Sequence, residues 1–455
     1  MRALLLLTAL GALAPLAAEA QEVEQTNLRY DEDWSVLGDA AGPGWQRIKY
    51  APLDKDGAVH LTLGGEARAR FEGFDNNLWG DPPAPDDGYV WLRVMPHADL
   101  HAGPARVFVQ GIAGYARGVG AGKGPADETG IDLLQGFADV RIGLGEDGDL
   151  TLRGGRELVA LGSERLVGIR YGPNIPQAFD GVRAIATRGP VRIDAFHLRP
   201  VAVGGGDFDD AASKTRRLDG VYATITPVAA IGIDVYWLGY KNEAARFVGR
   251  SGREARDSFG VRFFGKRGDL GWNWEGIVQR GRFDGGPIRA WSIATETAWS
   301  FPQAALKPRL RLRANIASGD RNPMDGTLGT FNALFPKGKY FGELSPIGPR
   351  NIVNIHPSVD FDLGSGVTVE LAAATFWRHR RGDGIYDIPG QLIRPAAGSG
   401  ARHIGDQIEI SASWQASPVL SFSGSLSAFH AGRFIRETGR ARTIYMAGAE
   451  AMLKF

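Results

Sequence analysis

The stretch Lys307-Pro308-Arg309-Leu310-Arg311-Leu312-Arg313-Ala314-Asn315-Ile316 decides the fold, because apolar residues alternate in it with cationic or polar ones. A helix would scatter the guanidinium groups over every face. An extended strand sends the leucines, Ala314 and Ile316 to one side and the three arginines to the other. We interpret the leucine side as facing lipid and the arginine side as facing a water-filled lumen. The pattern therefore predicts a transmembrane β-barrel with a cationic channel.

Composition excludes several classes of protein. The chain has 455 residues, no cysteine, 52 lysines and arginines, and 51 aspartates and glutamates, so its formal net charge is +1. Bulk nucleic-acid binding needs a basic surplus, so nucleic acid is not an expected partner. Without cysteine there are no disulfides and no thiolate metal sites. The 63 glycines and the 10% aromatic content suit the turns and interfacial girdles of a barrel.

The first twenty residues predict a signal peptide. Arg2 gives the positive start, Ala3–Leu13 the apolar core, and Ala18-Glu19-Ala20 the cleavage site. The alternative, a membrane anchor, is weakened by an apolar run shorter than the ~20 residues that a spanning helix needs. Because no later stretch approaches that length, a role in the membrane has to come from strands.

The alternating pattern recurs to the end of the chain. It predicts about eighteen strands, an even number as bacterial single-chain barrels require, near residues 59–71, 88–101, 104–117, 132–144, 149–157, 179–188, 190–199, 217–227, 230–241, 256–267, 269–282, 287–301, 306–318, 351–362, 366–379, 403–415, 418–430 and 441–455.

The connections between these strands alternate between short and long. Tight-turn sequences such as Arg188-Gly189-Pro190 and Leu363-Gly364-Ser365-Gly366 alternate with long, polar, glycine-rich segments. The long segments are 72–87, 118–131, 158–178, 200–216, 242–255, 319–350 and 380–402, with a modest loop near 281–287 as the exception. Short periplasmic turns and long external loops are typical of an outer-membrane barrel, so we predict that location in a Gram-negative bacterium.

Three regions follow: a signal peptide at 1–20, an N-terminal segment at 21–58 and the barrel at 59–455. The segment 21–58 lacks alternation, and we expect it on the periplasmic side or in the lumen. The last strand alternates from Tyr445 to a final Phe455, which resembles the assembly signal of bacterial outer-membrane proteins.

The lumen face predicted by the strands carries charge of both signs. Pairing across neighbouring strands is the plain interpretation for most of these groups. The Arg309, Arg311 and Arg313 row differs, because no acid alternates with it and its charges repel unless neighbouring acids or an anionic solute neutralise them. Arginine offers paired donors that match carboxylates. The candidate pore-lining and substrate-binding residues are Glu66, Arg68, Arg70, Arg93, Arg141, Arg153, Arg183, Arg192, Arg309, Arg311 and Arg313.

Motifs for catalysis or cofactors are mostly missing. There is no G-x-S-x-G, and residues 118–124 fail the spacing of a phosphate loop. The acids between Asp320 and Asp325 lack the EF-hand register, which leaves a turn, with weak calcium binding as an alternative. No other cofactor is expected. His97 and His101 would lie ~13 Å apart on a strand, too far for one metal ion.

Two stretches carry a family resemblance: Leu61–Glu72 (LTLGGEARARFE), and Gly155–Leu166 (GRELVALGSERL) with its continuation Phe179–Arg183. Together with the segment around Trp34 and the stretch Arg350–Pro357, they resemble the alginate export family of outer-membrane porins. The resemblance implies a monomeric 18-stranded barrel with an arginine-rich constriction that passes an anionic polysaccharide. It also implies that loops or a periplasmic turn partly plug the pore. Arg68, Arg70 and the Arg309–Arg313 row match the basic lining. The turn at 363–366 is short, so segment 21–58 is the candidate for a periplasmic plug.

The leading hypothesis is a non-enzymatic channel for an anionic polysaccharide such as alginate, or its oligosaccharides, with weak arginine sites along its path. Its partners would be outer-membrane lipid, the polysaccharide, and export or lyase components of the periplasm. An uptake porin for other small anions or sugars is the first alternative. A barrel enzyme of the lipase or protease kind, drawing on His356, His379, His403 or His430, and an adhesin are alternatives of other classes.

Overall fold

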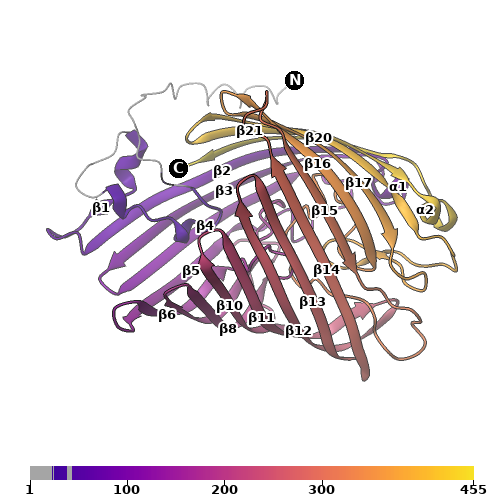
Figure 1. Cartoon of the computed structure of the whole chain (residues 1–455), viewed down its shortest axis with the longest axis horizontal. Coiled ribbons are helices and arrows are strands. Elements are labelled where there is room, and N and C mark those ends of the chain that lie inside the picture. The colour runs from indigo at the N-terminus through magenta and orange to yellow at the C-terminus, as the bar shows by residue number, and fades with distance from the viewer. Residues whose placement is uncertain (1–22, 24, 38–43) are drawn as a thin grey trace.

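The computed structural model describes Val23 and residues 25–37 and 44–455, so the predicted signal peptide lies outside the described residues. Within that part of the chain, eighteen long antiparallel strands form a barrel (Figure 1). Their bounds are β2 (Val59–Asp75), β3 (Asp87–Ala102), β4 (Ala105–Arg117), β5 (Gly130–Gly143), β6 (Gly148–Leu158), β7 (Ala178–Arg188), β8 (Val191–Ala202), β10 (Arg216–Val228), β11 (Ile231–Phe247), β12 (Arg250–Arg267), β13 (Leu270–Phe283), β14 (Gly286–Ser300), β15 (Arg309–Ala317), β16 (Ile352–Gly364), β17 (Val367–Arg378), β20 (His403–Ser417), β21 (Leu420–Ala431) and β22 (Ile444–Lys454).

The barrel closes on itself. Each of these strands pairs with the next in the sequence, and β22 pairs with β2 from Glu66↔Lys454 to Asp75↔Tyr445. Closure leaves neither the first nor the last strand with an unpaired edge, as a membrane interior requires. The predicted fold class and strand number are confirmed.

The side chains of the stretch 307–316 point in the directions that its alternating pattern predicts. Leu310 and Leu312 on β15 are 50% and 49% exposed, whereas the Arg311 guanidinium between them reaches carboxylates on β16 and β17. The same exposed apolar face continues around the barrel, with residues such as Val261, Ile293, Leu371 and Leu426. A lipid-facing surface, with the charged side chains turned inward, follows from these orientations.

One predicted loop is wrong. Instead of a loop over 242–255, β11 and β12 continue to a two-residue turn at Val248 and Gly249, whose φ angles are 47° and 78°. The modest loop at 281–287 likewise shrinks to Asp284 and Gly285, with φ angles of 50° and 80°. Paired positive φ angles are those of a type I′ hairpin turn, whose twist matches the strands it joins. Strands therefore replace loop residues at this part of the rim.

The remaining elements are short. They are the 3-10 helices η1 (Arg29–Asp31), η2 (Ser35–Leu37) and η3 (Gly44–Ile48), the helices α1 (Asn77–Gly80) and α2 (Arg433–Thr438), and the strands β1 (Ala51–Pro52), β9 (Ala211–Ala212), β18 (Ile385–Tyr386) and β19 (Leu392–Arg394). Among the described residues, no helix is long and apolar enough to cross a membrane.

Two external connections fold inward and meet each other. We call residues 159–177 the first loop and residues 318–351 the second loop. Val167 of the first loop and Phe335 of the second form a parallel bridge, and both side chains are fully buried. Their apolar residues form one cluster with inward side chains of the barrel wall, including Phe179 and Tyr240. Burial of this cluster holds both loops inside the ring of strands.

Described parts of the N-terminal segment pack against the inner wall and the C-terminal end of the barrel. Tyr30 meets the inward rings of Phe108 and Phe137 edge-on, and its hydroxyl donates to the Leu158 carbonyl at 2.7 Å. A guanidinium nitrogen of Arg29 donates to the Phe455 carbonyl at 2.8 Å. That the whole segment 21–58 forms a unit that plugs the pore stays a prediction.

Docking of this segment is expected to strengthen as the pH rises. The Lys49 ammonium nitrogen lies 5.0, 5.9 and 6.0 Å from the ring centroids of Trp34, Trp45 and Phe455. Burial, with the nearby charge of Arg29, lowers the pKa of Lys49 from 10.5 to about 7. Between these two values the undocked segment binds more protons than the docked one, so raising the pH through this window favours docking.

Protease protection of the segment, measured across that pH window, tests this expectation. A Lys49→Met variant keeps the bulk of the side chain without its titration, so its protection should depend less on pH. Equal pH dependence in the two proteins would assign the effect to another group.

Candidate functional site: the barrel interior

Inward charges near the short-turn end form a paired network. Arg153 on β6 binds both oxygens of Asp139 at 2.8 Å and reaches Glu157 at 3.0 Å. Arg183 on β7 contacts the same Glu157 at 3.1 Å and Asp194 at 2.7 Å. The Arg153 guanidinium also lies over the ring of Tyr30. These groups neutralise one another across strands and support the N-terminal segment.

Two further predicted cations of this region lie nearer to solvent. Arg192 on β8 is half-exposed and pairs with Asp194 at 2.9 Å. Arg141 on β5 stands at the rim with 66% of its side chain exposed and pairs with Asp149 at 2.6 Å. A direct contact of these groups with a solute stays a prediction.

The first loop is held by β2 and β3. Arg68 donates to the carbonyl oxygens of Tyr171 and Pro173 at 3.0 and 2.7 Å. Arg93 pairs with Glu66 at 2.6 Å and donates to the Asn174 carbonyl at 3.1 Å. The Tyr171 hydroxyl donates to the same Glu66 carboxylate. Three of the four predicted residues of β2 and β3 are buried beneath this loop: Glu66, Arg68 and Arg93. As placed, they fix the loop rather than stand free in water.

The second loop is held by a cluster around Arg70. Its guanidinium contacts Glu72 at 2.7 Å on its own strand, Glu450 at 2.8 Å on β22, and Glu343 of the loop. Lys339 of the loop binds Glu72 and Glu343 at 2.6 and 2.7 Å. Burial alone would raise the pKa of Glu343, but Lys339 and Arg70 hold it at about 2. Two cations and three carboxylates therefore tie the loop to the wall at neutral pH.

The arginine row of β15 faces acids on its neighbours. Arg311 pairs with Asp360 on β16, and both Arg311 and Arg313 lie 3.8 Å from Glu370 on β17. Arg313 also lies 3.8 Å from Glu296 on β14. Neighbouring strands thus supply the carboxylates that the row itself lacks. Arg309, at the short-turn end, is exposed and forms no ion pair with any described residue.

Arg313 keeps unused donors. Its contacts are long ion pairs, it donates no hydrogen bond within the described part of the chain, and its buried Nε has no hydrogen-bond partner there. Lys337 of the second loop and Arg165 of the first stand nearby: burial lowers the pKa of Lys337, and the charges of Arg313 and Arg165 add to that effect. Three cationic side chains, one from β15 and one from each loop, therefore lie close together where the two loops meet β15. Sequence periodicity missed Arg165 and Lys337, because loop residues follow no strand alternation.

Beside this cationic group lies a polar cavity of about 230 Å³. Arg70, Glu343, Asp360, Glu370 and Glu450 reach it. Half of the other lining residues bear a hydroxyl group: Thr368, Ser411, Ser413, Ser423 and Ser425. The alternation of Ser421, Ser423, Ser425 and Ser427 in the sequence is a signal that could have predicted an inward hydroxyl row on β21. Cations, carboxylates and hydroxyls thus follow one another along the wall from β15 to β22.

The alternative enzyme site does not assemble. His356 is buried in the wall beside the arginine row, and His379 packs edge-on against Trp291 at the long-loop end. His403 pairs with Asp406, whereas the His430 ring contacts the Thr443 hydroxyl. Asp406 lies opposite His430 in the strand register, but His356 and His379 stand apart from that pair, so the four histidines do not form one cluster.

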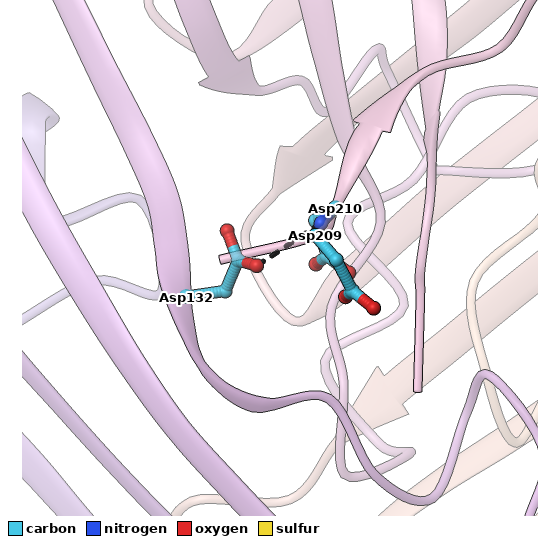
Figure 2. Close-up of side chains that lie close together, drawn as sticks. All are labelled: Asp132, Asp209 and Asp210. Carbon is cyan, nitrogen blue, oxygen red and sulfur yellow. Dashed lines mark hydrogen bonds between the residues drawn. The ribbon is translucent and has the colours of Figure 1, made fainter. Parts of the chain in front are cut away.

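Three carboxylates do gather at the long-loop end, at a place that sequence analysis did not single out. Asp132 points toward Asp209 and Asp210, and their oxygens lie within 4.8 Å of one another (Figure 2). The Asp210 amide donates to Asp132 at 3.1 Å, and Arg156 lies 3.7 Å from Asp132. The cluster thus carries its own cation and amide donor. In the segment proposed for weak calcium binding, Asp320 and Asp325 accept backbone N–H groups, and calcium binding there stays a prediction.

Comparisons with known proteins agree with this barrel. The model of the family described as alginate export matches residues 59–448. Among solved structures, Acinetobacter baumannii OccAB1 is 11% identical with a TM-score of 0.60, over 90% of this chain and 99% of that one. Pseudomonas aeruginosa OccK2 in complex with glucuronate is 13% identical with a TM-score of 0.57, over 87% and 98%. Pseudomonas aeruginosa OpdK with vanillate is 11% identical with a TM-score of 0.58, over 86% and 98%.

At these identities the likeness to solved structures concerns the fold. No curated protein sequence matches the chain. The family match, however, covers nearly the whole barrel, and the closed ring of eighteen strands with inward-folded loops fits an outer-membrane channel. This chain belongs to the alginate export family.

Proposed function

We propose that the protein is an outer-membrane channel for carboxylated sugars, either an anionic polysaccharide such as alginate or its oligosaccharides. The single observation that carries the proposal is the wall from β15 to β22. There, Arg313 with its unused donors stands near a cavity whose wall includes five hydroxyl-bearing side chains.

This wall suits the two kinds of group on a uronic acid. Guanidinium donors match a carboxylate, and rows of hydroxyls can exchange hydrogen bonds with the hydroxyls of a sugar. The carboxylates Asp360 and Glu370 keep the cations from holding an anion too tightly, since a solute has to displace an existing ion pair. Weak sites in series allow a solute to enter and also to leave.

Uptake of small anions is the second candidate. The cavity of about 230 Å³, to which the second loop contributes Glu343, has room for a small carboxylate. In addition, two proteins with a similar fold have structures with the small carboxylates glucuronate and vanillate. In this alternative a monomeric barrel passes single uronates or aromatic acids, and partner proteins of the periplasm are not needed.

Current recordings from single channels in planar bilayers test the proposal. Alginate oligomers added to one side should interrupt the ionic current at concentrations where neutral oligosaccharides of equal length do not. Interruption by glucuronate but not by its oligomers would favour the second candidate. Equal effects of charged and neutral sugars would contradict both.

A further inference from the structure

An arginine pair stands on the outer surface of the barrel. Arg280 on β13 and Arg289 on β14 lie directly opposite each other in the strand register, and both side chains are exposed. Arg282 follows two residues along on the same face of β13. Like charges directly opposite on neighbouring strands destabilise a sheet. A favourable interaction with something outside the protein would offset that cost.

The position of these arginines relative to the lipid-facing apolar band shows which part of the membrane they contact. Two residues nearer the membrane centre on the outward faces of β13 and β14, Val278 lies opposite Trp291. Ile293 is the next exposed side chain on β14 in that direction. The apolar face continues to Trp274 and Trp299 at the short-turn end. Successive outward positions are ~7 Å apart, so the arginines stand just beyond the apolar band. Because these strand ends carry the connections of the external side, this is the level of the outer-leaflet headgroups.

The neighbouring carboxylates form no ion pair with these arginines. Asp257, opposite Arg280 on β12, accepts a hydrogen bond from the Trp237 indole at 2.9 Å, and Asp284 pairs with Arg250 at 3.3 Å. Within the described residues, Arg280, Arg282 and Arg289 form no ion pair. Two other arginines of the external end do have carboxylate partners: Arg217 pairs with Asp219 at 3.0 Å and Arg253 with Glu243 at 2.6 Å.

A cavity of about 170 Å³ adjoins this surface. Arg289 and Trp291 line it together with Arg321 and Arg380, which likewise form no ion pair within the described part of the chain. The two acidic side chains of the cavity accept hydrogen bonds from backbone N–H groups. Asp320 accepts one from Asn322 at 3.0 Å, and Asp325 accepts one from Thr327 at 2.8 Å. The cavity thus offers three guanidinium groups without acidic side-chain partners.

We propose that this outer surface binds the phosphorylated headgroup of an anionic glycolipid in the external leaflet. Arg280 and Arg289 contact one phosphate between the strands, since their fork-like donors match its oxygens. Arg321 and Arg380 contact charge at the adjoining cavity, while the lipid chains lie along Val278 and Ile293. Trp291 stands at the boundary, where amphipathic rings are typical. This inference concerns the outside of the barrel and does not depend on the solute that the lumen passes.

Binding of purified lipid A to the full-length protein in neutral detergent, measured by native mass spectrometry, tests this proposal. The Arg280→Gln/Arg289→Gln variant should bind lipid A roughly thirtyfold more weakly, from the loss of two arginines near an anionic headgroup. The matched Arg217→Gln/Arg253→Gln variant loses the same charge from the same end of the barrel. It should bind as the unaltered protein does, since both of its arginines already have carboxylate partners.

Two further probes separate the source of the phosphate. Dephosphorylated lipid A should bind weakly to every variant, and inorganic phosphate should compete poorly because it lacks the chains. Equal binding of the phosphorylated and dephosphorylated lipids would overturn the proposal, as would equal losses in the two variants. Inorganic phosphate that displaces lipid A at equal concentration would overturn the commitment to a lipid. Heat-modifiable gel mobility and unchanged channel conductance establish that each variant is folded.

Discussion

Replacing Arg70 with alanine is expected to raise the single-channel conductance several-fold. This guanidinium contacts three carboxylates. Its removal leaves Glu72 and Glu343 with Lys339 alone, and Glu450 with the more distant Arg68 at 3.8 Å. Breaking a buried ion-pair cluster by removing one partner typically costs about 3–5 kcal/mol. The acids that remain repel each other across the joint between the wall and the second loop. We therefore expect the loop to leave the lumen for a large part of the time.

Single-channel recordings of the variant in planar bilayers measure this effect. An Arg141→Ala variant is the matched control, because it removes an arginine whose one partner, Asp149, is at the exposed rim. Its conductance should equal that of the unaltered protein. A folded Arg70→Ala barrel with unchanged conductance would show that the apolar cluster alone keeps the loop in place.

If the channel prefers anions as we propose, reversing the charge of Arg311 and Arg313 is expected to make it prefer cations. At an effective dielectric constant of ~20, a unit charge ~10 Å from a passing ion contributes ~1.7 kcal/mol. Two reversals should change the ratio of anion to cation permeability by well over tenfold. The effect is increased because the new glutamates join Asp360, Glu370 and Glu296.

Reversal potentials in a salt gradient give the permeability ratio. Arg311→Gln/Arg313→Gln should shift it in the same direction by a smaller amount, which separates charge from shape. Arg192→Glu, placed near the mouth beside Asp194, should shift it least. If all three variants kept the original ratio, ions would pass along a route away from β15.

The barrel itself could be predicted from the sequence, because alternation of apolar and charged residues is a local signal. Leu310 and Leu312 face out and Arg311 faces in for the same reason that the pattern was visible in the chain. The loop predicted at 242–255 was wrong because the apolar alternation weakens beyond the membrane, whereas strand pairing continues to the turn at Val248 and Gly249.

The interior was harder to predict, since its contacts join residues far apart in sequence. Arg68 and Arg93 carry the alternation expected of a lining, yet they hold carbonyl groups of the first loop. The sequence of β2 and β3 contains no local signal that a loop about a hundred residues away folds over these two arginines. Arg165 and Lys337 were missed for the converse reason, because their position near Arg313 depends on how two loops fold together.

The tight hairpin between β11 and β12 has a practical consequence. Its tip bears no inward loop, and a side chain built at Gly249 would meet open space. Foreign peptides are tolerated best at such exposed tips. An epitope inserted there should be displayed on living cells, where antibody staining could follow how much protein reaches the surface without obstructing the conduit.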